Sequence, residues 1–236
     1  MPESNPNTSR YAIYFCPSSG ASLHRLGSHW LGRDATTCAT LDPNVPDHIR
    51  REDWLRVTEN PRRYGFHATL KPPFRLAEGV TLEDLKAALR DFAQRHDSFE
   101  APRLGVRAVA QFLALTLSAV SEDLQSLAAD SVSEFERFRA PATERDLAQR
   151  MSDSLSPRER AHVLQWGYPY VFDTWKFHMT LTSSLSPESL ALFEPYLRER
   201  FAPACENPLL VDSICIFHQP SPENSFYLLD RVSLRS

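Results

Sequence analysis

Hydrophobic residues alternate in some short segments of the chain and recur every three to four residues in others. Alternation is typical of β-strands, and the longer spacing is typical of amphipathic helices. In the first half these patterns predict a strand over 11–16, a helix over 22–31, a loop over 41–53, a strand over 64–70, a helix capped by Thr81 and a strand over 104–110. In the second half they predict a strand over 112–117, a helix opened by Ser121, a strand over 177–182, a helix opened by Ser186 and Pro187, and strands over 209–217 and 225–232.

The order of the predicted elements repeats. The series strand–helix–strand–helix–strand occurs over 10–110 and again over 111–233, which indicates an internal duplication. We therefore expect an α+β fold with two pseudo-symmetric lobes, residues 10–110 and 111–236. Each lobe should have an antiparallel-dominated sheet with helices outside, and a central cleft should lie between the lobes. Residues 1–9 are polar and are expected to form a disordered tail.

A charged stretch at about 134–165 interrupts the second lobe. Its charges of both signs are interspersed, which favours a solvated helical insertion. A mobile lid over the cleft is the alternative interpretation, because long segments of this kind often cover active sites.

The charge balance and the distribution of apolar residues argue against a protein that binds long nucleic acids, spans a membrane or is secreted. The 236 residues include 26 Lys and Arg against 30 Asp and Glu, for a net charge of −4. Proteins that hold long nucleic acids by charge are usually basic, so the balance argues against such a partner. No apolar run approaches the ~20 residues of a membrane span. The first ten residues lack the basic and apolar regions of a signal peptide, so we expect a cytoplasmic protein without a membrane partner.

One short segment departs from the acidic average. Between Pro61 and Ala77 there are four cations and no acid: Arg62, Arg63, Lys71 and Arg75. A basic island in an acidic chain favours a compact anionic ligand over a long polymer.

Cysteine, glycine and most histidines indicate no metal and no cofactor. The four cysteines include no C-x-x-C pair, which favours free thiols in a reducing compartment. Gly27 and Gly32 have the spacing of a phosphate-binding loop, but Arg33 and Asp34 stand where that loop needs Lys and Ser or Thr. Six histidines are expected to act as caps, surface groups or packing residues: His24, His29, His48, His96, His162 and His218.

Two pentapeptides of one form occupy equivalent places in the two repeats. Phe-His-Ala-Thr-Leu spans 66–70 and Phe-His-Met-Thr-Leu spans 177–181, with the histidines 111 residues apart. A single His-x-Thr sequence is usually structural, but two in matching contexts indicate function. Because side chains alternate along a strand, the apolar members should face the core together: Phe66, Ala68, Leu70, Phe177, Met179 and Leu181.

The opposite faces of these two strands are polar. They carry Arg63, Gly65, His67, Thr69 and Lys71 in one strand, and Thr174, Lys176, His178, Thr180 and Thr182 in the other. If the lobes pair through these faces, two imidazoles, two threonine hydroxyls and two ammonium groups line one cleft. Such a face is unusual unless a ligand binds there.

This set of groups suits phosphoester chemistry without a metal. Imidazole titrates near pH 6.5, so one histidine can accept a proton from the nucleophile and the other can protonate the leaving oxygen. Threonine hydroxyls can donate to phosphate oxygens, and a lysine can hold their charge. We expect His67, Thr69, His178 and Thr180 to be catalytic. We expect Arg63, Tyr64, Lys71, Lys176 and Thr182 to bind substrate. The pattern leaves open which histidine is the acid.

Two His-x-Thr strands in a duplicated α+β chain resemble the 2H phosphoesterase superfamily. Its members include RNA 2′,3′-cyclic phosphodiesterases and phosphodiesterases that open ADP-ribose 1″,2″-cyclic phosphate. The resemblance covers nearly the whole chain in organisation and is most specific at the two motifs. It implies that His67, Thr69, His178 and Thr180 form the site.

Further segments resemble a bacterial branch of this superfamily that is found with phosphonate-degradation genes. These segments are Arg10–Phe15, Trp30–Asp34, Tyr64–Phe74, Phe138–Pro141 and Trp166–Tyr170. The resemblance implies a setting in which a carbon–phosphorus lyase pathway generates a ribose 1,2-cyclic phosphate that must be opened.

The expected partner is therefore a small phosphorylated sugar or nucleotide, with 5-phosphoribosyl 1,2-cyclic phosphate as the first candidate. The rival substrate is a 2′,3′-cyclic end on RNA, on which Tyr168 and Tyr170 could stack. A binding module that holds a phosphorylated ligand without turnover is a further alternative. The pattern does not indicate an oligomeric state.

Overall fold

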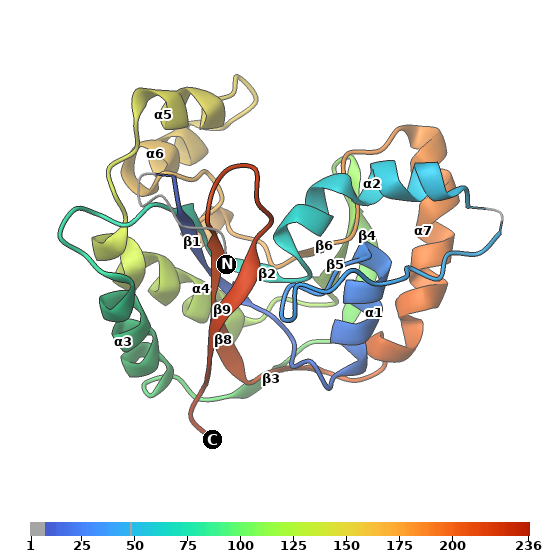
Figure 1. The fold of residues 1–236 in the computed structure, drawn as a ribbon, viewed down its shortest axis with the longest axis horizontal. Coiled ribbons are helices and arrows are strands. Elements are labelled where there is room, and N and C mark those ends of the chain that lie inside the picture. Colours follow the sequence, from blue (N-terminus) through green and yellow to red (C-terminus); the bar gives the residue numbers. More distant parts are fainter. Residues whose placement is uncertain (1–7, 48) are drawn as a thin grey trace.

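The computed structural model describes residues 8–47 and 49–236, which form a mixture of helices and strands (Figure 1). His48 and positions 1–7 of the predicted tail lie outside the described residues. The first half contains β1 (Arg10–Phe15), α1 (Ser22–Leu31), α2 (Arg51–Tyr64), β2 (Ala68–Phe74), α3 (Leu82–Ala93), β3 (Phe99–Ala101), β4 (Leu104–Val109) and β5 (Phe112–Leu117). The second half contains α4 (Glu122–Glu134), α5 (Glu144–Arg150), α6 (Pro157–Trp166), β6 (Met179–Thr180), α7 (Pro187–Phe201), β7 (Leu209–Val211), β8 (Ser213–Gln219) and β9 (Tyr227–Ser233). Short 3₁₀ turns cover Phe135–Phe138, Phe172–Thr174 and Ala202–Cys205.

A seven-stranded sheet in the order β4-β5-β6-β2-β1-β8-β9 forms the centre of the fold, and β3 pairs separately with β7. Every pair of neighbouring strands is antiparallel, which confirms the predicted α+β class. The predicted lobe boundary falls between β4 and β5, which pair along their length. Because β8 also pairs with β1, one sheet draws on both predicted lobes. The division into two lobes stays a prediction.

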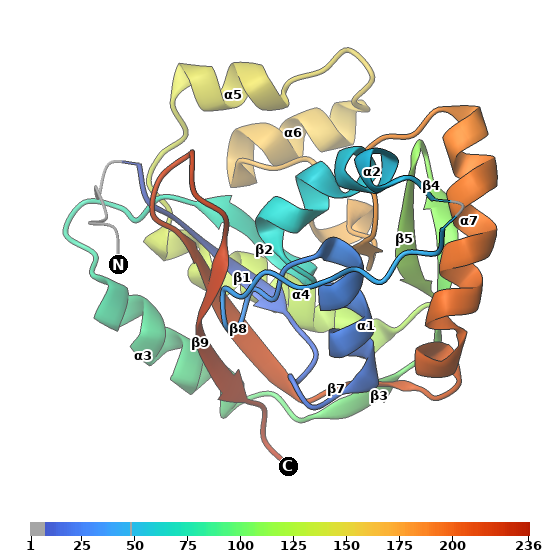
Figure 2. The same cartoon turned by 45° about the vertical axis from the view of Figure 1, so that its right-hand side comes forward.

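Helices cover different parts of this sheet. The helices α3 and α4 pack on the side of β8, β9 and β2, whereas α7 packs against β4, β5 and α1. The helices α5 and α6 lie beside each other at one end of the molecule (Figures 1 and 2). Three helix starts were predicted correctly because their caps are local: the side chains of Thr81, Ser121 and Ser186 each accept a hydrogen bond from the first turn.

Strand β1 is buried on both faces. Tyr11, Ile13 and Phe15 join the main hydrophobic core. Ala12, Tyr14 and Cys16 join a second, smaller core with Phe217 and Phe226. This explains the unbroken apolar run from Tyr11 to Cys16, since a strand with one wet face would alternate. The smaller core supports the side of the sheet that carries the polar motif residues.

Helix α2 was not predicted. Residues 51–53 were expected in a loop and Tyr64 in a strand, but both belong to this helix. Its buried residues are Trp54, Val57, Thr58 and Pro61, which have helical spacing but include only two conventional core residues. Pro61 has no N–H to donate to the Val57 carbonyl, and that carbonyl instead accepts from the backbone N–H of Ser183 at 2.6 Å.

Strand β2 runs from Ala68 through Pro72 and Pro73, although the two prolines were expected to end it. The partner on one side, β6, is only two residues long and pairs with β2 at Ala68. Adjacent N–H groups of a strand point to opposite sides. One proline therefore faces this edge, where no further described strand pairs, and the other lies where the register with β1 shifts between Lys71 and Phe74. The predicted strand over 209–217 is likewise divided at Asp212 into β7 and β8, which belong to different sheets.

Two helices, α5 and α6, lie within the charged stretch at about 134–165, whose status as an insertion stays a prediction. The stretch is also anchored, because Leu155, His162 and Val163 are buried. Ser9, predicted to lie in the tail, is buried and hydrogen-bonds to His218 at 2.8 Å. No helix among the described residues is long and apolar enough to cross a bilayer.

Candidate active site

The two His-x-Thr motifs meet at the junction of β2 and β6. Ala68 pairs with Met179 in antiparallel register. Extending this register by one residue each way sets His67 opposite Thr180, and Thr69 opposite His178. All four side chains therefore lie on one face of the sheet, and Phe66, Ala68, Leu70, Phe177, Met179 and Leu181 all lie in the main core on the other side, as predicted.

A pocket of about 440 Å³ covers this junction. Its lining includes His67, Thr69, His178 and Thr180. Three tyrosines and two arginines from other parts of the chain complete much of the wall: Tyr14, Tyr64, Tyr168, Arg10 and Arg150. The pocket volume lies within the range of small-molecule sites, roughly 300–1,000 Å³.

The two histidines are oriented by the same hydrogen bond. Nδ1 of His67 lies 2.9 Å from the carbonyl oxygen of Gly65, and Nδ1 of His178 lies 2.9 Å from that of Lys176. A carbonyl only accepts, so each Nδ1 carries the proton and donates it. In the neutral ring Nε2 then keeps its lone pair and is free to accept a proton. In both motifs, the carbonyl two positions before the histidine thus selects the tautomer.

Gly65 is required at the first of these positions. Its φ is +80°, a conformation that other residues rarely adopt, and a Cβ there would lie 2.4 Å from Cβ of Ala35. This backbone ends α2 and directs the carbonyl at His67.

His67 lies in an aromatic enclosure. Its ring stacks on that of Tyr14 with centroids 3.7 Å apart and planes 18° apart, and Phe217 lies 6.0 Å away. Burial lowers the pKa of His67 to about 4; the bond to Gly65 opposes the shift, and the proximity of His178 adds to it. His67 is therefore neutral near pH 7. Its Nε2 lies 3.3 Å from the Thr69 hydroxyl.

His178 lies at the border of the pocket. Its nearest aromatic ring is Phe112, at 5.9 Å and tilted. His178 also lines a neighbouring depression with Trp175, Lys176 and Phe177. The second histidine is therefore less enclosed than the first, although the two motifs match in sequence.

The prediction that Lys71 shares the cleft face of His67 is wrong. Tyr14 pairs with Thr69 but Ile13 pairs with Lys71, so β2 contains one extra residue at this point. This β-bulge reverses the alternation and turns Lys71 toward α4. There its ammonium donates to the carbonyl of Val132 at 3.0 Å and to Glu136 at 2.7 Å, and the side chain is buried.

Three other predicted substrate-binding residues lie outside the pocket lining. Thr182 is buried, and its hydroxyl accepts from the N–H of Leu113. Lys176 lines the neighbouring depression instead, and Arg63 is exposed at the end of α2. Tyr64 does line the pocket.

The predicted basic island is largely used inside the protein. Arg62 donates to the carbonyl of Leu31 and to the hydroxyl of Thr58. Lys71 is paired with Glu136, and Arg75 with Asp146. The pocket's cations are instead Arg10 and Arg150. Arg10 precedes the first apolar strand and Arg150 lies within the insertion, so only the folded chain brings them together.

Two further polar clusters lie away from the pocket. Cys16, His24 and Asp34 have the order of a catalytic triad, with contacts of 3.7 and 3.3 Å. Cys16 is buried, however, and burial raises the pKa of its thiol to about 11, so this cluster holds no reactive thiolate. In the described part of the chain, no group of three His, Cys, Asp or Glu residues could hold a metal ion.

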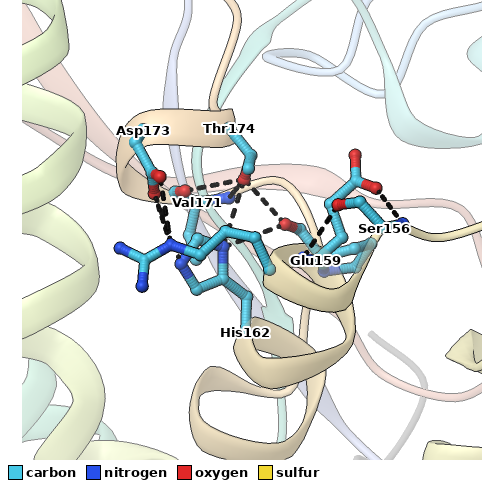
Figure 3. A network of polar contacts seen from close by, with 8 residues as sticks. Ser156, Glu159, His162, Val171, Asp173 and Thr174 are labelled. Atoms are coloured by element: carbon cyan, nitrogen blue, oxygen red, sulfur yellow. Dashed lines mark hydrogen bonds and ion pairs between the residues drawn. The ribbon is translucent and has the colours of Figure 1, made fainter.

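The second cluster connects α6 to the segment before His178. His162 on α6 contacts the Pro169 carbonyl, the Thr174 hydroxyl and the Asp173 carboxylate at 3.2, 3.2 and 3.4 Å (Figure 3). The hydroxyl of Thr174 also donates to Pro169 at 2.8 Å. These contacts hold both ends of the loop that places Tyr168 in the pocket.

The glycines with phosphate-loop spacing serve packing. A Cβ on Gly27 would lie 2.3 Å from the Phe66 ring, and Gly32 ends α1 with a φ of +69°. Asp34 accepts hydrogen bonds from the backbone and hydroxyl of Thr36. The segment therefore packs against the site instead of forming a nucleotide cradle.

Curated relatives of this chain have names that refer to a phosphorylated ribose. The chain is 35% identical over 234 residues to "Ribose 1,5-bisphosphate phosphokinase PhnN" of Janthinobacterium sp. (strain Marseille), which covers 97% of this chain and 51% of that protein. It is 33% identical over 225 residues to a protein of the same name from Laribacter hongkongensis (strain HLHK9), covering 95% of this chain and 52% of that protein. The chain thus spans about half the length of these relatives.

Solved structures that align with this chain include Escherichia coli LigT complexed with NADP⁺, at 12% identity and a TM-score of 0.45, covering 97% of this chain and 99% of that chain. They also include TT0787 of Thermus thermophilus, at 16% identity and a TM-score of 0.45, covering 96% and 98%. A structure named only as a phosphoesterase aligns at 14% identity and a TM-score of 0.44, covering 97% and 99%. A family model matches residues 69–227, which is more than half of the sequence, and the chain belongs to that family, described as "Protein of unknown function (DUF1045)".

Proposed function

We propose that this chain is a metal-independent phosphodiesterase that opens a small sugar cyclic phosphate. The observation that carries the proposal is the pair of histidines at the β2–β6 junction, each with Nδ1 held by a backbone carbonyl. Each histidine also has a threonine of the other motif opposite it. Two imidazoles in one pocket, each with Nδ1 already engaged and Nε2 left for proton transfer, are the groups that acid–base opening of a phosphodiester requires.

His67 is the general base in this proposal. Its pKa of about 4 keeps it neutral, and its Nδ1–H is already donated to Gly65. Nε2 can therefore remove a proton from water as the water oxygen attacks phosphorus. His178, in its protonated form, gives the Nε2 proton to the ring oxygen that leaves. Thr69 and Thr180 donate to the non-bridging oxygens, whose charge grows in the transition state.

The preferred substrate is 5-phosphoribosyl 1,2-cyclic phosphate. Breaking its bond between phosphorus and O2 leaves the phosphate on O1 and yields ribose 1,5-bisphosphate, the compound in the names of the two curated relatives. A pocket of about 440 Å³ also suits a sugar phosphate better than a long polymer. We assign the kinase activity in those names to the half of the relatives that this chain does not span.

A 2′,3′-cyclic end on RNA is the second candidate substrate. The observation that favours it is the pair of Tyr168, in the pocket, and Tyr170, 45% exposed beside it, with ring centroids 5.7 Å apart. Exposed aromatic rings next to a phosphate site can stack unpaired bases.

The test is a side-by-side measurement of kcat/KM, in the presence of a chelator, on the ribose cyclic phosphate, 2′,3′-cyclic nucleotides and a cyclic-ended oligonucleotide. We expect the ribose compound to be preferred, with ³¹P NMR showing a phosphate on O1. The variant with both His67→Ala and His178→Ala controls for contaminating activity. An oligonucleotide preference above about tenfold, some 1.4 kcal/mol, would replace the sugar substrate with RNA ends. Binding of the ribose compound without turnover would instead favour a binding module.

A further inference from the structure

Two arginines project into the pocket without an acidic partner. Arg10 opens β1 and Arg150 ends α5, and both line the pocket with His67 and His178. The Arg10 guanidinium donates through Nε and Nη2 to the amide oxygen of Gln219, at 2.8 and 2.6 Å. Within residues 8–47 and 49–236, neither arginine forms an ion pair.

Two acidic residues in this region, Asp146 and Glu136, already have cationic partners. Asp146, one turn before Arg150 on α5, binds Arg75 at 2.7 Å and caps the helix through Thr143. Glu136 is held by Lys71 and Arg139. Among the described residues, the carboxylates of Asp146 and Glu136 are therefore bound to other cations, and neither is ion-paired with Arg10 or Arg150.

Aromatic rings hold these cations in place. The guanidinium carbon of Arg150 lies 5.0 Å from the ring centroid of Tyr168, and that of Arg10 lies 5.5 Å from Phe226. Such contacts orient a planar guanidinium while leaving N–H donors free. The carbonyl of Pro169, the residue after Tyr168, contacts His162, whose network with Thr174 and Asp173 is drawn in Figure 3, so the backbone next to Tyr168 is anchored.

Burial and the repulsion between Arg10 and Arg150 both disfavour the charged form of the Arg150 guanidinium. Burial lowers the pKa of Arg150, and the charge of Arg10 lowers it further. Two like charges in a partly buried pocket oppose each other unless an anion lies between them. The arrangement is therefore expected to gain most from a ligand that carries negative charge into this end of the pocket.

We propose that Arg10 and Arg150 form a second anion subsite, which holds a terminal phosphate monoester of the substrate while the two histidines act on its cyclic phosphodiester. This inference rests on the proposed function and extends it to a substrate with two separate phosphates. Guanidinium forks match phosphate oxygens bidentately, which fixes orientation as well as adding affinity. The charged insertion, through Arg150, then selects the substrate.

The test compares two cyclic phosphates that differ only in the terminal phosphate: ribose 1,2-cyclic phosphate with and without a 5-phosphate. The quantity measured is kcat/KM for the compound with the 5-phosphate divided by kcat/KM for the compound without it. In Arg150→Gln this ratio should fall by about 10–100-fold, mainly through KM. Arg10→Gln should lower it in the same direction. Arg145→Gln is the matched control, because Arg145 lies on the same helix outside the pocket lining, and it should leave the ratio unchanged.

An unchanged ratio in Arg150→Gln, or an equal loss on both compounds, would overturn the subsite. Failure of the proposed function is distinguishable, because the wild-type protein would then open neither compound. In that case binding of ribose 5-phosphate, measured by calorimetry, decides the subsite. The wild-type protein should bind it at least about tenfold more tightly than Arg150→Gln, and equal binding would overturn the subsite.

Discussion

The two His-x-Thr segments share a sequence and a hydrogen bond, but their surroundings differ. Both histidines donate Nδ1–H to the carbonyl two residues earlier. His67 is stacked on Tyr14 within the smaller core, and burial lowers its pKa to about 4. His178 lies at the border of the pocket, where its closest ring is 5.9 Å away. The motif sets the tautomer, and the neighbouring residues distinguish the two rings.

This difference in surroundings gives a physical basis for assigning the base role to His67 and the acid role to His178. A histidine that stays neutral is a proton acceptor, and we propose that the less enclosed His178 is the proton donor. The shared His-x-Thr pattern by itself would imply interchangeable roles. The enclosure of His67 by Tyr14 and Phe217 makes the two sites inequivalent.

Replacing either histidine should have the largest effect. His67→Gln and His178→Gln should each lower kcat by about 10²–10⁴-fold, because each removes one proton transfer. Thermal unfolding should separate them: His178→Gln should unfold near the wild-type temperature, whereas His67→Gln loses the stack on Tyr14 and should unfold earlier. A variant with wild-type kcat would remove that histidine from the mechanism.

Replacing Thr69 or Thr180 should have the next largest effect on activity. Thr69→Val and Thr180→Val should each lower kcat roughly 10–100-fold, the value of one hydrogen bond to a charged oxygen. Thr→Ser at the same positions keeps the hydroxyl and is the matched control. If the valine variants lose activity no more than the serine variants, the hydroxyls do not contact the phosphate.

Stability should also depend on pH through His67. The unfolded residue takes up a proton near pH 6.5, whereas the folded one takes it up only near pH 4. The unfolded state therefore binds more protons in this window, and stability falls as the pH drops through it. His67→Gln should lessen that fall by an amount on the order of 1–3 kcal/mol, at about 1.4 kcal/mol per pKa unit.

Urea unfolding at pH 7 and pH 4.5 measures this difference. His218, whose pKa burial also lowers to about 4, remains in both proteins as a common background. The same measurement on His178→Gln provides the comparison. Identical pH dependence in the wild type and in His67→Gln would show that His67 is not enclosed in solution.

Lys71→Met should have the smallest effect on activity. Lys71 lies on the core side of β2, and Glu136 keeps Arg139 as a partner at 2.5 Å when the lysine is lost. We expect kcat/KM to stay within about twofold, while the free energy of unfolding changes by roughly 1–3 kcal/mol. A tenfold loss of kcat/KM with unchanged stability would indicate that Lys71 contributes to the active site after all.

Local patterns predicted much of the fold and the centre of the site. Strict alternation placed Phe66 and Phe177 in the core, and short-range caps such as Thr81 marked helix starts. These features depend on residues close in the sequence. Helix α2 was missed because Thr58 and Pro61 occupy half of its buried face.

The rest of the site depends on contacts between distant segments. The bulge that turns Lys71 away arises where β2 pairs with β1, and no pattern within β2 signals it. Arg10 and Arg150 meet only after the sheet and the insertion have formed. Composition located positive charge between Pro61 and Ala77, but the fold uses most of it in internal ion pairs and hydrogen bonds.

The division of roles between His67 and His178 is tested most directly by changing the leaving group. Two ribose phosphodiesters would be compared, one with an alkoxide and one with a 4-nitrophenolate leaving group, in the wild type, His67→Gln and His178→Gln. A good leaving group needs no proton, so a missing acid matters less with it. We expect His178→Gln to recover most of its lost kcat/KM on the nitrophenyl ester, whereas His67→Gln should remain equally impaired on both esters. Recovery by His67→Gln instead would contradict the assignment of His67 as the base.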